Sequence, residues 1–142
     1  MTPLVRRAAE EDLDVLVEIE QECFARPHWD AVSFLKYDCI VAEVDGQIAG
    51  FLVSRQVLPA VNGARAEREI LNVAVVPRFR CLGIATTLLQ HELARPATHY
   101  LEVRESNAAA RQLYEKIGFF EVGRRPDYYD FPIETAIVMK MK

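Results

Sequence analysis

Apolar and polar residues alternate in short blocks along this chain, and the period of each block predicts its secondary structure. The block EEDLDVLVEIEQECF has a mostly apolar stripe at helical spacing, so we expect a helix there. The stripe consists of Leu13, Leu16, Val17, Glu20 and Phe24. A short strand, LVRRA, precedes this helix, and a brief second helix is expected over residues 31–36.

Two turn signals separate the β-rich blocks that follow. The runs CIVAEV and QIAGFLVSRQV flank Asp45-Gly46, a pair that favours a type I′ turn, so they are predicted to form a hairpin. Asn62-Gly63 marks the tip of a second, longer turn. The strand EREILNVAVV comes next and is expected to stop at Pro77.

The second half of the chain alternates helices with strands. The stretch PRFRCLGIATTLL reads as a turn and a helix through about residue 94. THYLEVR then reads as a buried strand. SNAAARQLYEKIGF reads as a helix capped by Ser106 or Asn107 and stopped at Gly118. Two last strands, FFEVGR and TAIVMKM, are expected on either side of a loop, RPDYYDFP.

The order of these elements defines the expected fold class. A run of antiparallel strands precedes a β-α-β crossover, which makes its two strands parallel. We therefore expect an α+β fold with a mixed, twisted sheet of about seven strands flanked by about four helices on both faces. Where the central parallel strands splay, a ligand cleft is expected at the strand ends.

Composition narrows the class of protein. A chain of 142 residues, 51% of them hydrophobic, predicts a single domain over residues 1–142. Its apolar runs are far shorter than the roughly 18 residues of a membrane span, and the N-terminus has no signal-like region. Cys23, Cys39 and Cys81 lack metal-ligand spacing, which predicts a reducing cytoplasmic location and no metal. The net charge of −4 argues against nucleic acid as a partner, and no pattern indicates an oligomeric state.

The turn in PRFRCLGIATTLL is a candidate anion site. It lacks the glycines of a P-loop or a dinucleotide fingerprint. It does lead into a helix, whose first N–H groups have no internal partner. Gly83 and Ala85 would let an anion reach the backbone, with Arg78 and Arg80 nearby. A pyrophosphate site and a plain strand-to-helix turn with solvated arginines both fit this pattern.

A second group of candidate residues lies downstream. Alternation along YLEVR places Glu102 on the strand face opposite Leu101 and Val103, and Tyr114 lies two turns into the next helix. Glu102 and Tyr114 are therefore expected to line the cleft that contains the anion-binding turn. Each residue also has a plainer alternative: Glu102 facing solvent, Asn107 capping a helix and Tyr114 filling core.

Together these motifs resemble those of the GNAT-type N-acetyltransferases, which use acetyl-coenzyme A. VVPRFRCLGIA is similar to their pyrophosphate motif, Arg/Gln-x-x-Gly-x-Gly/Ala. LEVRESNAAARQLYEKIGF and RRPDYYDFPIETAIVM resemble the RimI type, which acetylates the N-terminal alanine of a small-subunit ribosomal protein. The likeness is specific over residues 70–139, and before them it rests on element order, GQIAGF and IEQECF. It implies a GNAT-like fold with acetyl-CoA as cosubstrate.

The resemblance also implies a role for individual residues. The backbone of residues 73–75 would pair with the pantetheine and thioester, residues 81–86 would wrap the pyrophosphate, and Asn107 would contact the coenzyme arm. The implied coenzyme-binding residues are Val73, Ala74, Val75, Cys81, Leu82, Gly83, Ile84, Ala85, Thr86 and Asn107. Glu102 would be the general base and Tyr114 the general acid.

These roles suit direct transfer to a primary amine. An α-amine with a pKa near 8 is mostly ammonium at neutral pH, so a carboxylate has to take its proton before it attacks the thioester. Backbone N–H near Val75 would stabilise the oxyanion, and the Tyr114 phenol would protonate the departing thiolate. Glu69, six residues before Val75, is a rival base because some GNAT enzymes that modify lysine carry a glutamate there.

The acceptor is less constrained than the reaction. FARPHWD has His28 between Pro27 and Trp29, where the RimI type usually has Pro-Trp, so specificity can differ. A protein N-terminus, including that of a ribosomal protein, is the favoured acceptor. A small-molecule or other amine is the alternative, and a non-catalytic acyl-CoA binding module is a third reading.

Overall fold

The computed structural model of the chain describes residues 2–24 and 29–141. It divides into two compact units, each considered by itself below. The first unit contains Met1–Arg55 and Leu71–Arg95, and the second contains Gln56–Ile70 and Pro96–Lys142.

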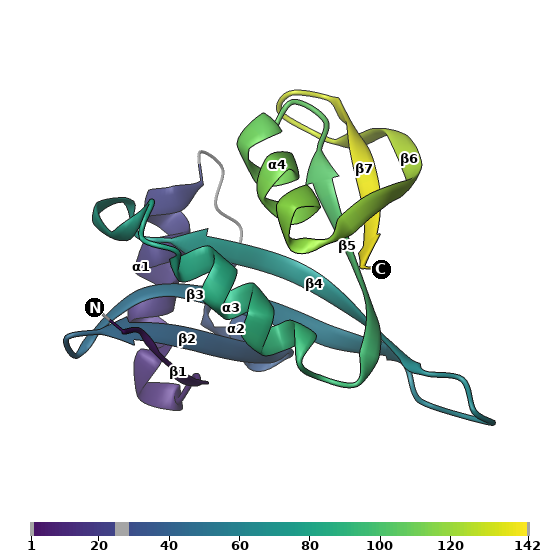
Figure 1. The fold of residues 1–142 in the computed structure, drawn as a ribbon. Helices are drawn as coiled ribbons and strands as arrows, with labels where there is room; N and C mark the ends of the chain where they lie inside the picture. Colours follow the sequence, from purple (N-terminus) through teal and green to yellow (C-terminus); the bar gives the residue numbers. More distant parts are fainter. Residues whose placement is uncertain (1, 25–28, 142) are drawn as a thin grey trace. The chain divides into compact units, whose positions relative to one another are not determined.

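Seven strands form one sheet in the order β1-β2-β3-β4-β5-β7-β6 (Figure 1). The strands are β1 (Leu4–Arg7), β2 (Asp38–Val44), β3 (Gln47–Leu58), β4 (Ala66–Val75), β5 (Ala97–Arg104), β6 (Phe119–Tyr129) and β7 (Glu134–Met141). The helices are α1 (Leu13–Cys23), α2 (Ala31–Leu35), α3 (Ile84–Leu93) and α4 (Ala108–Ile117). The β4–β5 pair is parallel, whereas β1–β2, β2–β3, β5–β7 and β6–β7 are antiparallel. This mixed sheet with four helices confirms the predicted fold class.

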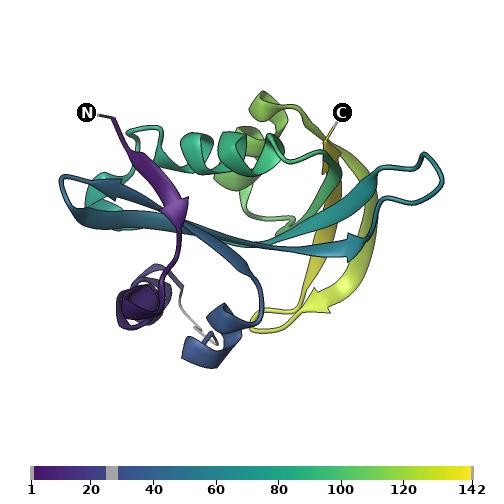
Figure 2. The ribbon, with the colours of Figure 1, turned by 90° about the horizontal axis from the view of Figure 1, so that it is seen from below.

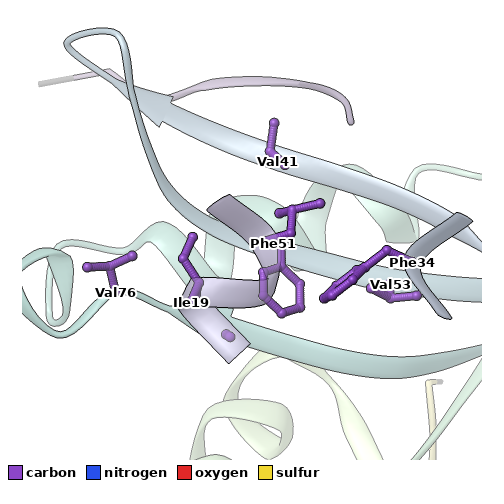
Figure 3. Packing of buried hydrophobic residues seen from close by; sticks show 8 residues of the cluster. Ile19, Phe34, Val41, Phe51, Val53 and Val76 are labelled. Atoms are coloured by element: carbon purple, nitrogen blue, oxygen red, sulfur yellow. The ribbon is translucent and has the colours of Figure 1, made fainter. Parts of the chain in front are cut away.

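In the first unit, α1 and α3 cover opposite faces of the β2–β3 hairpin (Figure 2). The hairpin turns at Asp45 and Gly46, whose φ angles of 51° and 77° are both positive, as a type I′ turn requires. A hydrophobic core joins α1 and α2 to the strands (Figure 3). Its buried members are Leu16, Ile19, Phe34, Val41, Phe51, Val53, Ala74 and Val76.

The predicted stripe of the first helix is only partly the buried one. Leu16 and Glu20 are buried as expected, and Ile19, which the stripe did not include, is buried with them. Phe24 lies beyond the last turn of α1 in an extended conformation and is 36% exposed. The helix ends at Cys23, so the helical period no longer applies to Phe24.

The second unit is built around β5. Its residues alternate strictly between buried and half-buried, which confirms that Leu101 and Val103 face the opposite side from Glu102. β5 pairs in parallel with the first half of β4, where Ile70 lies beside Leu101, and antiparallel with β7. Helix α4 packs against β6 and ends at Gly118, whose φ of 129° suits a residue without a Cβ.

Strand β6 corrects one prediction. The sequence suggested a loop over RPDYYDFP, but β6 continues through Arg125 to Tyr129, and the loop is limited to residues 130–133. Pro126 has no N–H to donate, so a regular ladder of hydrogen bonds cannot continue through this position. The strand instead shifts register between Arg125 and Tyr129, with Asp127 at a positive φ of 53°. β6 is an edge strand, where such bulges and prolines are tolerated.

Candidate functional site

The candidate coenzyme turn lies in the first unit, between β4 and α3. After a short 3-10 turn at Pro77–Phe79, the backbone is left-handed at Cys81 (φ 63°) and again at Gly83 (φ 79°). Gly83 is the N-cap of α3, and a Cβ built on it meets no atom within 4 Å. The glycine thus satisfies a backbone conformation and leaves the space in front of the helix start open. That is the geometry in which N–H groups can bind an anion.

The arginines of this turn contact the protein. The Nε of Arg80 donates to the Val75 carbonyl over 3.1 Å, and Nη2 of Arg78 donates to Oε1 of Gln47 over 3.2 Å. Arg80 therefore ties the turn to the end of β4. A role of the backbone of residues 81–86 in binding the pyrophosphate stays a prediction.

Residues of β3 and α1 pack closely against the end of β4. A Cβ added to Gly50 on β3 would lie 2.6 Å from the Ala74 carbonyl oxygen, so only glycine permits this approach. The thiol of Cys23 on α1 donates to the Val75 carbonyl over 3.4 Å. Ala74 is buried, whereas Val73 and Val75 are half-buried. These contacts fix the strand segment that was predicted to pair with the pantetheine.

The candidate base lies in the second unit. The Glu102 side chain is 14% exposed, and its Oε2 is buried without a hydrogen bond to any described residue. Its cationic neighbour is Arg125 on β6, whose Nε lies 3.5 Å from Oε2. Glu69 on β4 lies on the same side, because Glu69 is the register partner of Tyr100 and Tyr100 shares a face with Glu102.

These neighbours act on the acidity of Glu102 in opposite directions. Burial raises the pKa of Glu102, because it disfavours the ionised carboxylate. The guanidinium of Arg125 lowers that pKa, and the carboxylate and hydrogen bonding of Glu69 raise it. The net direction is upward, which brings the carboxyl closer to the range in which it can exchange protons with an amine.

Two tyrosines of the second unit have raised pKa values. Tyr114 on α4 packs edge-on against Phe119 with centroids 5.9 Å apart, and burial raises its pKa. Tyr129 at the end of β6 has its pKa raised to about 12 by burial and then by the charge of Glu102, with a smaller effect of Tyr114. The charge of Glu102 thus acts on the Tyr129 phenol, and Glu102, Tyr114 and Tyr129 all belong to the second unit.

Asn107 starts helix α4 as its N-cap, since its Oδ1 accepts from the Ala110 N–H over 3.2 Å. Its side chain has the capping role that the sequence offered as the plainer alternative. A contact with the coenzyme arm stays a prediction.

Sequence reasoning missed Arg125 and Tyr129 as neighbours of Glu102. The sequence predicted that RPDYYDFP forms a loop, which gives no facing for its side chains. The register of β6 shifts between Glu121 and Gly123 and again between Arg125 and Tyr129, so alternation along the strand does not predict which face Arg125 or Tyr129 occupies. The predicted departure at Pro27 and His28 lies outside the described residues.

The described parts of the chain contain neither a cluster of metal-ligating side chains nor a helix suited to spanning a membrane. Over residues 2–24 and 29–141, no three His, Cys, Asp or Glu side chains gather as a metal ion would require. No helix within those ranges has the length and apolar character needed to cross a bilayer. The absence of a metal cofactor stays a prediction.

A model of the acetyltransferase (GNAT) family matches residues 6–119 of the chain. The [Ribosomal protein bS18]-alanine N-acetyltransferase of Salmonella typhimurium is 34% identical, covering 92% of this chain and 90% of that protein. An N-alpha-acetyltransferase of Sulfurisphaera tokodaii is 33% identical, covering 88% of this chain and 84% of that protein.

The same likeness extends to a solved structure. The ribosomal-protein-S18-alanine N-acetyltransferase from Escherichia coli superposes with a TM-score of 0.83 at 32% identity, covering 99% of this chain and 93% of that one. Its fold is thus shared over nearly the whole chain. The chain belongs to the acetyltransferase (GNAT) family and is an N-acetyltransferase similar to the ribosomal-protein alanine enzymes.

Proposed function

We propose that this protein transfers the acetyl group of acetyl-CoA to the N-terminal α-amine of a protein, with alanine as the favoured first residue. The observation that carries the proposal is the environment of Glu102, a largely buried carboxyl with one oxygen free of hydrogen bonds to described residues. This oxygen lies 3.5 Å from Nε of Arg125 but accepts no hydrogen bond from a described residue, so it can take a proton from a bound ammonium group. The names of the relatives at 33% and 34% identity support an α-amine as the acceptor.

Glu102 is the general base in this proposal. The acceptor enters as an ammonium ion, because an α-amine has a pKa near 8. Its positive charge is attracted to the acidic pair of Glu102 and Glu69. Glu102 takes one proton, directly or through a water molecule, and the neutral amine attacks the thioester carbonyl. The raised pKa of Glu102 makes it a stronger base than an ordinary carboxylate once it is ionised.

Tyr114 is the general acid. Burial raises the pKa of its phenol, so the hydroxyl stays protonated at neutral pH and has a proton to give. It protonates the coenzyme A thiolate as the tetrahedral intermediate collapses. No covalent intermediate on the protein is required.

Acetyl-CoA is the proposed cosubstrate. Its pyrophosphate is assigned to the backbone of residues 81–86, where two left-handed residues precede the α3 N-terminus. The backbone of residues 73–75 is assigned to the pantetheine and thioester, and Asn107 to the coenzyme arm. The family likeness supports these assignments, and the free cysteines at 23, 39 and 81 are consistent with the proposed reducing, cytoplasmic location.

The base assignment is tested by comparing Glu102→Gln with Glu69→Gln. Glu102→Gln removes the proton acceptor without changing the shape of the side chain. We expect kcat on an alanine-initiated peptide to fall about 100-fold or more, while the Kd for acetyl-CoA changes little. Glu69→Gln should retain most of the turnover. A severe loss in Glu69→Gln with nearly full activity in Glu102→Gln would assign the base to Glu69 instead.

A further inference from the structure

Arg104 occupies a central position in the second unit. It lies two residues after Glu102 on β5, so the two side chains leave the strand on the same face. Its side chain is 32% exposed, yet its guanidinium is surrounded by the segment that joins β6 to β7. The proposed function gives this arginine no role.

The guanidinium contacts four residues of that segment and its flanks, between positions 129 and 134. Nη2 donates to the Asp130 carbonyl over 2.8 Å, and Nη1 donates to the Pro132 carbonyl over 3.0 Å. Nη1 also pairs with Oε1 of Glu134 at 3.1 Å. The guanidinium carbon lies 4.5 Å from the ring centre of Tyr129. The planar, multi-donor fork of arginine suits such an arrangement, whereas a single ammonium group does not.

Glu134 extends the same network to the start of helix α4, which carries Tyr114. Its second oxygen, Oε2, accepts from the backbone N–H of Ser106 over 2.5 Å, directly before the N-cap of α4. Hydrogen bonds with Ser106 and the charge of Arg104 lower the pKa of Glu134, so it is ionised at neutral pH. Arg104 and Glu134 therefore connect β5, the 130–133 loop and the start of α4.

The 130–133 loop contains a residue with an unfavourable backbone conformation, and it exposes two large apolar side chains. Phe131 has a left-handed φ of 53°, a conformation that non-glycine residues rarely adopt. Phe131 and Ile133 are 68% and 69% exposed. Bonds from Arg104 to the carbonyls on either side of Phe131 offset this backbone cost. Without them, we expect the loop and Tyr129 to sample other conformations.

We infer that Arg104 is a positioning residue that fixes Tyr129 and the 130–133 loop against the strand carrying Glu102, and thereby sets the affinity for the acceptor. The inference rests on the proposed function, because it assigns the acceptor side of the same reaction. In this inference Arg104 acts without touching the amine or the thioester. Its effect is exerted through the backbone at Asp130 and Pro132 and through the Tyr129 ring.

The inference predicts a split between KM and kcat. In Arg104→Gln the shorter side chain cannot bridge both carbonyls and Glu134, so the KM for an alanine-initiated peptide should rise about tenfold or more. The effect on kcat should be smaller, and the Kd for acetyl-CoA should be unchanged. Arg104→Lys keeps the charge but not the fork, so it should resemble Arg104→Gln. It also serves as the test variant if Arg104→Gln does not fold.

Arg124→Gln is the matched control. Arg124 lies on β6 and pairs with Glu121 and Glu105 at the surface, so its loss removes the same charge from the same unit. Its kinetics should match those of the wild type. An unchanged peptide KM in folded Arg104→Gln, or full recovery of KM in Arg104→Lys, would overturn the inference.

A separate readout keeps this inference distinct from the proposed function. Amide hydrogen exchange over residues 129–134 should accelerate in Arg104→Gln but not in Arg124→Gln. If the wild type acetylates no peptide at all, the proposed function fails. The positioning role is then judged on exchange alone, and equal exchange in the two variants would overturn it.

Discussion

At the scale of single residues, the proposed chemistry of this protein depends on how Glu102 is surrounded. Two neighbours of opposite charge, Glu69 and Arg125, come from different strands and have opposing effects on its pKa. Burial and the charge of Glu102 raise the pKa of Tyr129 to about 12, so it stays neutral at physiological pH. The balance of burial, carboxylate and guanidinium therefore sets the pH range in which Glu102 is ionised and available as the proposed base.

This balance predicts opposite shifts in two variants. Because the base works only when ionised, kcat/KM should rise with pH as Glu102 loses its proton, above the ordinary carboxyl range. Glu69→Gln removes a group that raises the pKa of Glu102. The rise of kcat/KM with pH, here called the acidic limb, should therefore move to lower pH. Arg125→Gln removes the group that lowers the pKa, so the limb should move to higher pH. The measurement is kcat/KM against pH for both variants and the wild type.

Arg124→Gln controls for the general loss of a positive charge from β6. Its acidic limb should coincide with that of the wild type, since Arg124 pairs with Glu121 and Glu105 rather than Glu102. Shifts of Glu69→Gln and Arg125→Gln in the same direction would refute this electrostatic account.

Some of these residues were readable from sequence and others were not. Strand alternation correctly placed Glu102 opposite Leu101 and Val103, and helical spacing placed Tyr114 within α4. Arg125 and Tyr129 follow a bulge, where a one-residue change of register reverses which face a side chain occupies. Local pattern does not fix that register, because it depends on pairing with β7.

At the scale of elements, turn chemistry was the most reliable signal. Asp45-Gly46 and Asn62-Gly63 both adopt the positive φ angles that their sequence predicts. The predicted end of β6 was wrong, because the strand continues past Pro126 to Tyr129. A proline is tolerated there because β6 is an edge strand. Gly83 has both a structural and a proposed functional role. Its φ of 79° favours glycine, and the coenzyme is assigned to the open space beside it.

The turn therefore makes its own prediction. A valine at Gly83 should cost about 1–2 kcal/mol in backbone strain and place a branched side chain over the α3 N-terminus. We expect Gly83→Val to lose measurable acetyl-CoA binding by isothermal titration calorimetry while remaining folded by circular dichroism.

Gly63→Val provides a control with nearly the same backbone. Gly63 has a φ of 80° and nothing within 4 Å of an added Cβ, but it lies at a hairpin tip. It should show a similar strain and normal binding of acetyl-CoA. Normal binding by folded Gly83→Val would contradict the assignment of the pyrophosphate to this turn.

At the scale of the whole molecule, the sequence predicted the element order, the mixed seven-stranded sheet and the family. The chain divides into two compact units, and whether residues 1–142 form a single domain stays a prediction. The acceptor is the property least encoded by the fold, since one fold supports many substrates. The net charge of −4 favours a cationic amine over an anionic acceptor but does not distinguish a peptide from a small amine.

The most direct test of the central claim is to incubate the protein with acetyl-CoA and defined amines, and to locate the acetyl group by mass spectrometry. The set comprises an alanine-initiated peptide, the same peptide with a blocked N-terminus and an internal lysine, and small primary amines. We predict acetylation of the α-nitrogen of the free alanine peptide and no product from the blocked peptide. Acetylation of small amines or of lysine alone, or binding of acetyl-CoA without any turnover, would contradict the claim.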